Sequence, residues 1–278
     1  MNSDAGAAVA RLVEIMARLR AEGGCPWDRE QDLRSLRPYL LEEAFEVLEE
    51  MDRVVNGGPW SALCEELGDL LFQIVFHAQL ASEQGQFGME DVALAIAEKI
   101  ENRHPHVFGE AKVGSSSEVL ANWARLKAEE KRRRTGHEGS VLDGVPAAAP
   151  ALLRAERLTE KASQVGFDWP NLAGVRAKLD EELAELDRAI ASGERVAIEH
   201  ELGDVLFSLA NLARFLHSPG EDALREANCR FVRRFHRVET ALRAEGISPA
   251  KASLERMERE WEAAKREEAD RTGKPNPA

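Results

Sequence analysis

Residues 65–72 read EELGDLLF, a stretch in which Glu66 and Asp69 stand three residues apart at the start of an apolar run. Residues at this spacing share one face of an α-helix. Carboxylates within an apolar helix are costly unless they are paired or bound to a metal ion. The stretch recurs as ELGDVLF at residues 201–207. The chain therefore predicts two buried helices that each carry an acidic pair for a functional reason.

The repeat extends over most of the chain, in four landmarks that keep the same order. They are an EExxE pattern, the ExxD pattern, two cations four residues apart, and a tryptophan followed four residues later by a lysine. The first copy supplies Glu42, Glu43, Glu46, Glu66, Asp69, Lys99, Arg103, Trp123 and Lys127, and the second supplies Glu181, Glu182, Glu185, Glu201, Asp204, Arg230, Arg234, Trp261 and Lys265. Chance is a poor explanation of four ordered matches, and we infer an internal duplication.

Apolar residues between these landmarks recur at helical spacing, which predicts one helix after another. In the first copy we expect helices at 40–54, 60–80 and 89–103, with a turn at 56–59, which reads NGGP. Short turns between long helices imply antiparallel neighbours, so the predicted fold class is all-α, with two tandem helical-bundle modules. The expected boundaries are an N-terminal module at 5–135, a linker at 136–149, a C-terminal module at 150–270 and a disordered tail at 271–278.

Composition limits the functions that are open to the chain. Its 278 residues suffice for two ordinary domains, and a net charge of −13 argues against a general affinity for nucleic acid. No apolar run reaches the length of a membrane span and the polar N-terminus is unlike a signal peptide, so we expect a cytoplasmic protein with no membrane partner. Cys25, Cys64 and Cys229 are expected to be free thiols, buried or partly buried.

The acids of one module can meet if its two central helices pack antiparallel. Glu43 and Glu46 then share a face of one helix, with Glu42 beside them, and Glu66 and Asp69 share a face of the next. Clustered like charges raise one another's pKa unless a cation lies between them. Carboxylates with no cysteine and no matching histidine favour Mg²⁺ or Mn²⁺ over zinc or copper. EExxE alone is more typical of a solvated helix face; its combination with ExxD, present twice, favours a metal site.

The recurring cations and tryptophans allow two interpretations. Lys99 and Arg103 could hold phosphate oxygens together, as could Arg230 and Arg234. Such cations also form ordinary salt bridges on charged helices. The two repeated tryptophans could be core or interface aromatics, and only their recurrence before a lysine favours contact with a substrate.

With these motifs the chain resembles the MazG-type all-α nucleoside triphosphate pyrophosphohydrolases. The resemblance covers nearly the whole chain and includes GGCPWDREQDLRSLRPYLLEE, KIENRHPHVFG, SVLDGVP and VGFDWP. It implies a homodimer whose acids hold Mg²⁺, with Mn²⁺ as a substitute. It also implies hydrolysis of (d)NTPs to (d)NMP and pyrophosphate, with non-canonical or damaged nucleotides among the candidate substrates. In two-module members the C-terminal half is usually the catalytic one, yet the first half of this chain keeps every acid.

The resemblance further implies a role for each repeated residue. The metal ligands would be Glu43, Glu46, Glu66, Asp69, Glu182, Glu185, Glu201 and Asp204. Glu42 and Glu181 are the candidates to orient or deprotonate the attacking water. The substrate-binding candidates are Lys99, Arg103, Trp123, Lys127, Trp169, Arg230, Arg234, Trp261 and Lys265. Attack at the α-phosphorus follows from the resemblance alone.

Two other functions are compatible with parts of the pattern. An acidic helical protein could bind a basic partner without catalysis, and Mg²⁺ would then stabilise it little. A carboxylate-bridged di-iron bundle is disfavoured, because that site uses Glu-x-x-His on two helices, whereas here the i+3 position holds Glu or Asp.

Overall fold

The computed structural model describes residues 2–109, 114, 115, 118, 119, 122, 123, 126 and 139–272. The chain divides into two compact units, residues 1–136 and residues 137–278, called unit 1 and unit 2 below. The substrate-binding candidate Lys127, residues 136–138 of the predicted linker and residues 273–278 of the predicted tail lie outside the described residues.

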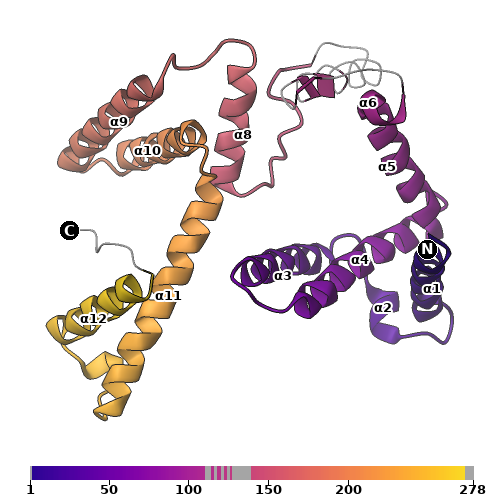
Figure 1. Cartoon of the computed structure of the whole chain (residues 1–278), viewed down its shortest axis with the longest axis horizontal. Coiled ribbons are helices and arrows are strands. Elements are labelled where there is room, and N and C mark those ends of the chain that lie inside the picture. The colour runs from indigo at the N-terminus through magenta and orange to yellow at the C-terminus, as the bar shows by residue number, and fades with distance from the viewer. Residues whose placement is uncertain are drawn as a thin grey trace. The chain divides into compact units, whose positions relative to one another are not determined.

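Unit 1 is built from helices that follow one another along the chain (Figure 1). The two long central helices, α3 and α4, correspond closely to the stretches predicted at 40–54 and 60–80, and α5 to the stretch at 89–103. The described helices are α1 (Asn2–Arg20), α2 (Pro26–Glu30), α3 (Arg37–Val55), α4 (Trp60–Glu83), α5 (Met89–Arg103) and α6 (Pro105–Phe108).

Unit 2 repeats a central pair of long helices and contains a further hairpin of helices. Its elements are α8 (Ala151–Ser163), α9 (Leu172–Ser192), α10 (Arg195–Phe215), α11 (Gly220–Ala244), the short 3-10 helix η1 (Pro249–Lys251) and α12 (Leu254–Thr272). No β-strand occurs in the part of the chain that the structure describes. The predicted all-α fold with two tandem helical modules is therefore confirmed.

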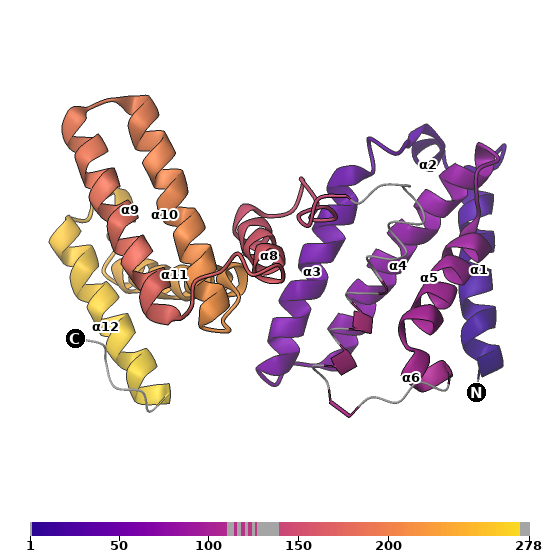
Figure 2. The ribbon, with the colours of Figure 1, turned by 90° about the horizontal axis from the view of Figure 1, so that it is seen from above.

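Tight turns make the central helices antiparallel in each unit. Residues 56–59 join α3 to α4, and Gly57 adopts a φ of 90°, a conformation that glycine reaches without strain. In unit 2 the turn is shorter, since Gly193, with a φ of 73°, ends α9 and α10 begins at Arg195. Figure 2 shows α3 beside α4 and α9 beside α10. The helices that carry EExxE and ExxD are thus packing neighbours in both units.

The apolar residues of α4 lie on more than one face of the helix. Val75 and Phe76 are fully buried and pack in a core with Met16 and Leu36. Leu67, by contrast, exposes 46% of its surface, as does Leu202 at the same position of α10, with 47%. The expectation of a buried helix is therefore wrong for one face, because an apolar period shows where apolar side chains lie but not what covers them.

The three cysteines are free, as predicted. Their expected burial is wrong for two of them, because Cys64 and Cys229 are exposed and only Cys25 is partly buried. Cys64 follows the buried Leu63 on α4, and one residue along a helix turns the side chain away from the core. None of the described helices combines the length and the apolar character that crossing a membrane requires.

Candidate active site

The antiparallel pair α3 and α4 brings three acids of unit 1 together. Glu43 of α3 and the ExxD pair Glu66 and Asp69 of α4 place carboxylate oxygens within 4.8 Å of one another. Glu43 and Glu66 are partly buried, whereas Asp69 is exposed. Glu46 is exposed beside them, close enough for its charge to act on both glutamates. Glu42, the candidate for water activation in this unit, is also exposed.

The proximity of these carboxylates changes their acidity. Burial raises the pKa of Glu43, and the negative charges of Asp69 and Glu46 raise it further. The pKa of Glu66 is raised for the same reasons, by burial and then by the charges of Glu46 and Asp69. A cation placed among these groups would lower the pKa of both glutamates, because an opposite charge favours the ionised carboxylate.

A buried amide lies beside the acids of unit 1. Gln73, which is 6% exposed, forms a side-chain hydrogen bond with Glu43 that lowers the pKa of that carboxyl. Its Oε1 atom is buried and has no hydrogen-bond partner among the described residues. Buried polar atoms are normally satisfied, so an orphan oxygen beside a group of acids is consistent with a missing ion or water.

Unit 2 assembles all four of its predicted acids between α9 and α10. Carboxylate oxygens of Glu182, Glu185 and Glu201 lie within 4.8 Å of one another, and Glu201 forms a second group of this kind with Asp204. Glu182 is the most buried of the four, at 6% exposure. Glu201 belongs to both groups and so links them.

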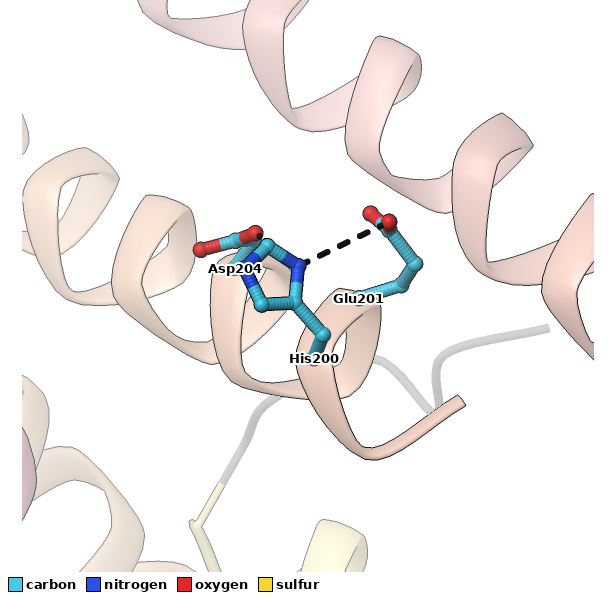
Figure 3. Close-up of side chains that lie close together, drawn as sticks. All are labelled: His200, Glu201 and Asp204. Atoms are coloured by element: carbon cyan, nitrogen blue, oxygen red, sulfur yellow. Dashed lines mark ion pairs between the residues drawn. The ribbon is translucent and has the colours of Figure 1, made fainter. Parts of the chain in front are cut away.

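Two residues that the sequence analysis did not select also belong to this cluster. Lys178 lies one turn before Glu182 on α9, and its Nζ atom is 2.7 Å from Glu182 and 2.9 Å from the water-activation candidate Glu181. Hydrogen bonds to these two glutamates raise the pKa of Lys178. The other is His200, which belongs to the second group, with Glu201 and Asp204 (Figure 3). Unit 1 has Tyr39 and Glu65 at these two positions, so a search for repeated residues passes over both.

A pocket opens directly beside the acids of unit 2. Aromatic, apolar and polar side chains share its wall, which is formed by Trp169, Val175, Lys178, Glu182, Asp204, Phe207, Ser208 and Asn211. The polar and charged members of the wall could hold the polar groups of a small molecule, and Trp169 and Phe207 could contact its apolar parts. The pocket and the carboxylates share Glu182 and Asp204, so a ligand in the pocket would reach the acids.

The corresponding positions in unit 1 are occupied by larger side chains. Aligning the acid motifs places Phe76 at the position of Asn211, and Gln73 at that of Ser208. Phe76 exposes 1% of its surface and belongs to the core of unit 1. The two units therefore share the acids but differ in the side chains beside them.

The predicted cations of unit 2 lie on the hairpin of α11 and α12. Arg234 pairs with Glu268 at 2.8 Å, while Arg230 approaches Glu226 at 3.9 Å and Lys265 approaches Glu262 at 2.9 Å. The structure thus pairs these three with glutamates of their own hairpin and does not bring them to the acids of α9 and α10. In unit 1, Lys99 is exposed and Arg103 is buried.

The repeated tryptophans make the same contact in both units. The guanidinium of Arg103 lies over the ring of Trp123, 5.2 Å from its centre, and that of Arg234 lies over Trp261 at 5.8 Å. Phe231 also packs against Trp261, with ring centres 5.2 Å apart. These cation–π contacts hold the aligned residues in equivalent arrangements and support the internal repeat.

Trp169 is held at the pocket by an ion pair. Asp168 bonds Arg214 of α10 through both carboxylate oxygens, at 2.5 and 3.0 Å, and also accepts a hydrogen bond from the backbone of Trp169. The bonds from Arg214 lower the pKa of Asp168. Because a two-point contact of this kind fixes geometry, the loop before α9 presents Trp169 to the pocket in a defined position.

The segments that carry these acids also match a known protein family. The family described as the MazG nucleotide pyrophosphohydrolase domain matches residues 31–108 and 172–240, which contain α3 with α4 and α9 with α10. The nucleoside triphosphate pyrophosphohydrolase of Escherichia coli (strain K12) is 44% identical to this chain, over 94% of the chain and 98% of that protein. A Thermotoga maritima protein named nucleoside triphosphate pyrophosphohydrolase/pyrophosphatase MazG is 42% identical, over 94% and 97%. A Mycobacterium tuberculosis nucleoside triphosphate pyrophosphohydrolase is 39% identical over 60% of the chain.

Proposed function

This chain belongs to the MazG nucleotide pyrophosphohydrolase family, and on that premise we propose that it hydrolyses nucleoside triphosphates to nucleoside monophosphates and pyrophosphate with the help of Mg²⁺. The observation that carries the proposal is the group of acids in unit 2. Glu182, Glu185 and Glu201 converge beside a pocket whose wall includes Trp169 and Asn211.

The donor set fits a hard divalent cation. Carboxylate oxygens are the protein ligands that Mg²⁺ and Mn²⁺ prefer, and Glu182, Glu185, Glu201 and Asp204 would hold the ion in unit 2. When bound, it would neutralise phosphate charge and lower the pKa of a water molecule. In unit 1, Glu43, Glu46, Glu66 and Asp69 would form the corresponding site. The raised pKa values of Glu43 and Glu66 and the orphan oxygen of Gln73 support a cation there.

The other residues of unit 2 would bind and orient the nucleotide. Trp169 can stack on a base, and stacking depends little on which base is present, so non-canonical or damaged nucleotides would be accepted with ordinary ones. Glu181, bonded to Lys178, is the candidate to orient the attacking water. Arg230, Arg234 and Lys265 remain the candidates for phosphate contacts; their present ion pairs are partly exposed and would be weak enough to exchange. Trp261 would support the hairpin of α11 and α12. In unit 1, Trp123 and Arg103 would have the corresponding role beside Lys99.

Unit 2 rather than unit 1 is proposed to carry the turnover. Both units place acids together, and in unit 2 the small or polar residues Ser208 and Asn211 stand beside them in a pocket wall. Phe76 and Gln73 fill the same positions in unit 1. Unit 1 would therefore bind a cation without a nucleoside.

A homodimer is the proposed assembly, and a reducing cytoplasm, consistent with three free thiols, is the proposed location. The exposed apolar residues on α3, α4, α9 and α10, among them Leu67 and Leu202, would be covered in such an assembly. We expect light scattering to give twice the 30.8 kDa mass of the chain. A mass of one chain at micromolar concentration would contradict this assembly.

Product analysis tests the proposed reaction. With ATP and Mg²⁺ we expect AMP and pyrophosphate in equal amounts, resolved by ³¹P NMR, and no turnover once EDTA has removed the metal. In ¹⁸O-labelled water the label is expected in AMP, because attack at the α-phosphorus places the water oxygen there. Release of ADP with orthophosphate would refute the assignment. A folded protein that turns over none of the common triphosphates would favour the acidic interaction protein instead.

A further inference from the structure

Arg214 of α10 joins two separate parts of the pocket wall in unit 2. On one side it bonds both carboxylate oxygens of Asp168, which also accepts a hydrogen bond from the backbone of Trp169. On the other side its Nε and Nη2 atoms donate to Oδ1 of Asn211, at 3.1 and 2.8 Å. Trp169 and Asn211 both line the pocket. One guanidinium therefore holds a wall residue of the loop before α9 and a wall residue of α10.

The bonds from Arg214 determine how the side-chain amide of Asn211 is turned. A guanidinium can only donate hydrogen bonds, so the amide atom that faces it must be the oxygen. Two donors of Arg214 occupy that oxygen, and Nδ2 of Asn211 forms no hydrogen bond with another described residue. Asn211 is therefore left with two N–H donors, and no acceptor, to offer a ligand in the pocket.

The ring of Trp169 is confined from a second direction. It lies against Gly174 in the first turn of α9, where an added Cβ atom would stand 3.2 Å from Cε3 of the indole. The ion pair on the other side is partly buried, with 18% of the Arg214 side chain and 25% of the Asp168 side chain exposed. A two-point contact with limited access to water fixes the geometry of its partners.

The first copy of the repeat does not contain this arrangement. Aligned by the acids, Arg214 and Asn211 correspond to Gln79 and Phe76. The side chain of Gln79 donates to Glu83 of its own helix. The central helices α3 and α4 pack against each other without the arginine, so pairing of the two helices does not require it. The arginine accompanies the pocket of unit 2 instead.

We propose that Arg214 is a positioning residue for the nucleoside: it holds Trp169 for stacking on the base and turns Asn211 so that Nδ2 donates to the base. The inference rests on the proposed function and deepens it. Each common base carries acceptor atoms on its edges, so a donor here is compatible with many bases. Arg214 contacts Asp168, Asn211 and the ring of Phe215 rather than the acids. Its loss should therefore weaken binding of the base and leave the chemical step unchanged.

The variant R214M removes every donor of this side chain and fills a similar space. We expect KM for ATP to rise at least about fivefold and kcat to stay within about twofold. Inorganic tripolyphosphate, which has the phosphates but no base, is the comparison ligand. Its inhibition constant, measured with Mg²⁺ in excess, should stay within about twofold of that of the original chain. The control R157M removes an exposed arginine that pairs with Glu160 on α8, and it should change none of these constants.

Two further variants separate positioning from charge and from folding. R214K keeps the positive charge but loses the planar fork that bonds Asp168 and Asn211 together, so KM for ATP should rise about as much as in R214M. It also decides the matter if R214M does not fold. Because Arg214 acts partly through Asn211, R214M should raise KM by a smaller factor in an N211A background than in the original chain.

The outcomes separate this inference from the proposed function. An unchanged KM for ATP in R214K, or equal losses for ATP and tripolyphosphate, would overturn the positioning role and leave the proposed reaction intact. Effects of R214M and N211A that simply multiply would also overturn it. An unmodified chain that hydrolyses no triphosphate would overturn the proposed function and this inference with it. A loss confined to ATP in both arginine variants, and smaller in the N211A background, would support the inference.

Discussion

Replacing Glu201 by glutamine is expected to lower kcat/KM for ATP hydrolysis by on the order of 100-fold or more, equivalent to about 3 kcal/mol of transition-state stabilisation. Glu201 is the one acid common to both ligand groups of unit 2, so its charge is the one that the site can least lose. Glutamine keeps the shape of the side chain and removes only that charge. The measurement is steady-state hydrolysis at saturating Mg²⁺.

The matched control is E66Q, at the same position of the repeat in unit 1. We expect a change of less than about twofold in kcat/KM, because in unit 1 the larger Gln73 and Phe76 stand at the positions of Ser208 and Asn211. Circular dichroism should confirm that both variants are folded. Equal losses in E66Q and E201Q would contradict the assignment of turnover to unit 2, and an unchanged E201Q would contradict the metal site there.

Filling the pocket of unit 2 with the residues of unit 1 is expected to raise KM at least about tenfold, a loss of about 1.4 kcal/mol in binding. The double variant S208Q/N211F places the counterparts of Gln73 and Phe76 in the wall that faces Glu182 and Asp204. These larger side chains would exclude the base while leaving every carboxylate in place. The measurement is the dependence of initial rate on ATP concentration.

The single variant S208A separates loss of space from loss of a hydroxyl. It enlarges the pocket slightly, and we expect KM to stay within about threefold of the original value. Because overpacking can also destabilise a helix pair, the Mn²⁺ affinity of S208Q/N211F serves as a check that the acids are still assembled. Unchanged KM in a double variant that still binds Mn²⁺ would show that the base lies elsewhere.

The helices and the meeting of the acids were predictable because both depend on local rules. Helical period and the turns at 56–59 and Gly193 set the antiparallel pairs, and the i, i+3 spacing then orients Glu66 and Asp69 on one face. The recurrence of both acidic motifs in the same order supported the prediction that the two helices carrying them are neighbours. The same reliance on repetition caused Lys178 and His200 to be missed, although their spacing of four from Glu182 and Asp204 is visible in the sequence.

Other features depend on tertiary packing that spacing does not reveal. The sequence predicted that Arg230 and Arg234 share a helix face but could not place α11 and α12 relative to the acids. In the structure Arg234 lies between Glu268 and the ring of Trp261. Likewise, Leu67 and Val75 are equally apolar, and only packing against α1 and α3 decides that one is exposed and the other buried.

The buried Phe76 has a consequence for how the two copies can diverge over evolutionary time. A closely packed interior accepts many exchanges among apolar side chains of similar volume. As the proposed site of turnover, unit 2 would have to keep both an opening and the groups around it, and an opening forgoes the dispersion contacts that a side chain would make there. A substitution near Asn211 must therefore preserve both folding and ligand binding. A substitution near Phe76 need preserve only folding. Drift should accordingly be faster in the first copy than in the second.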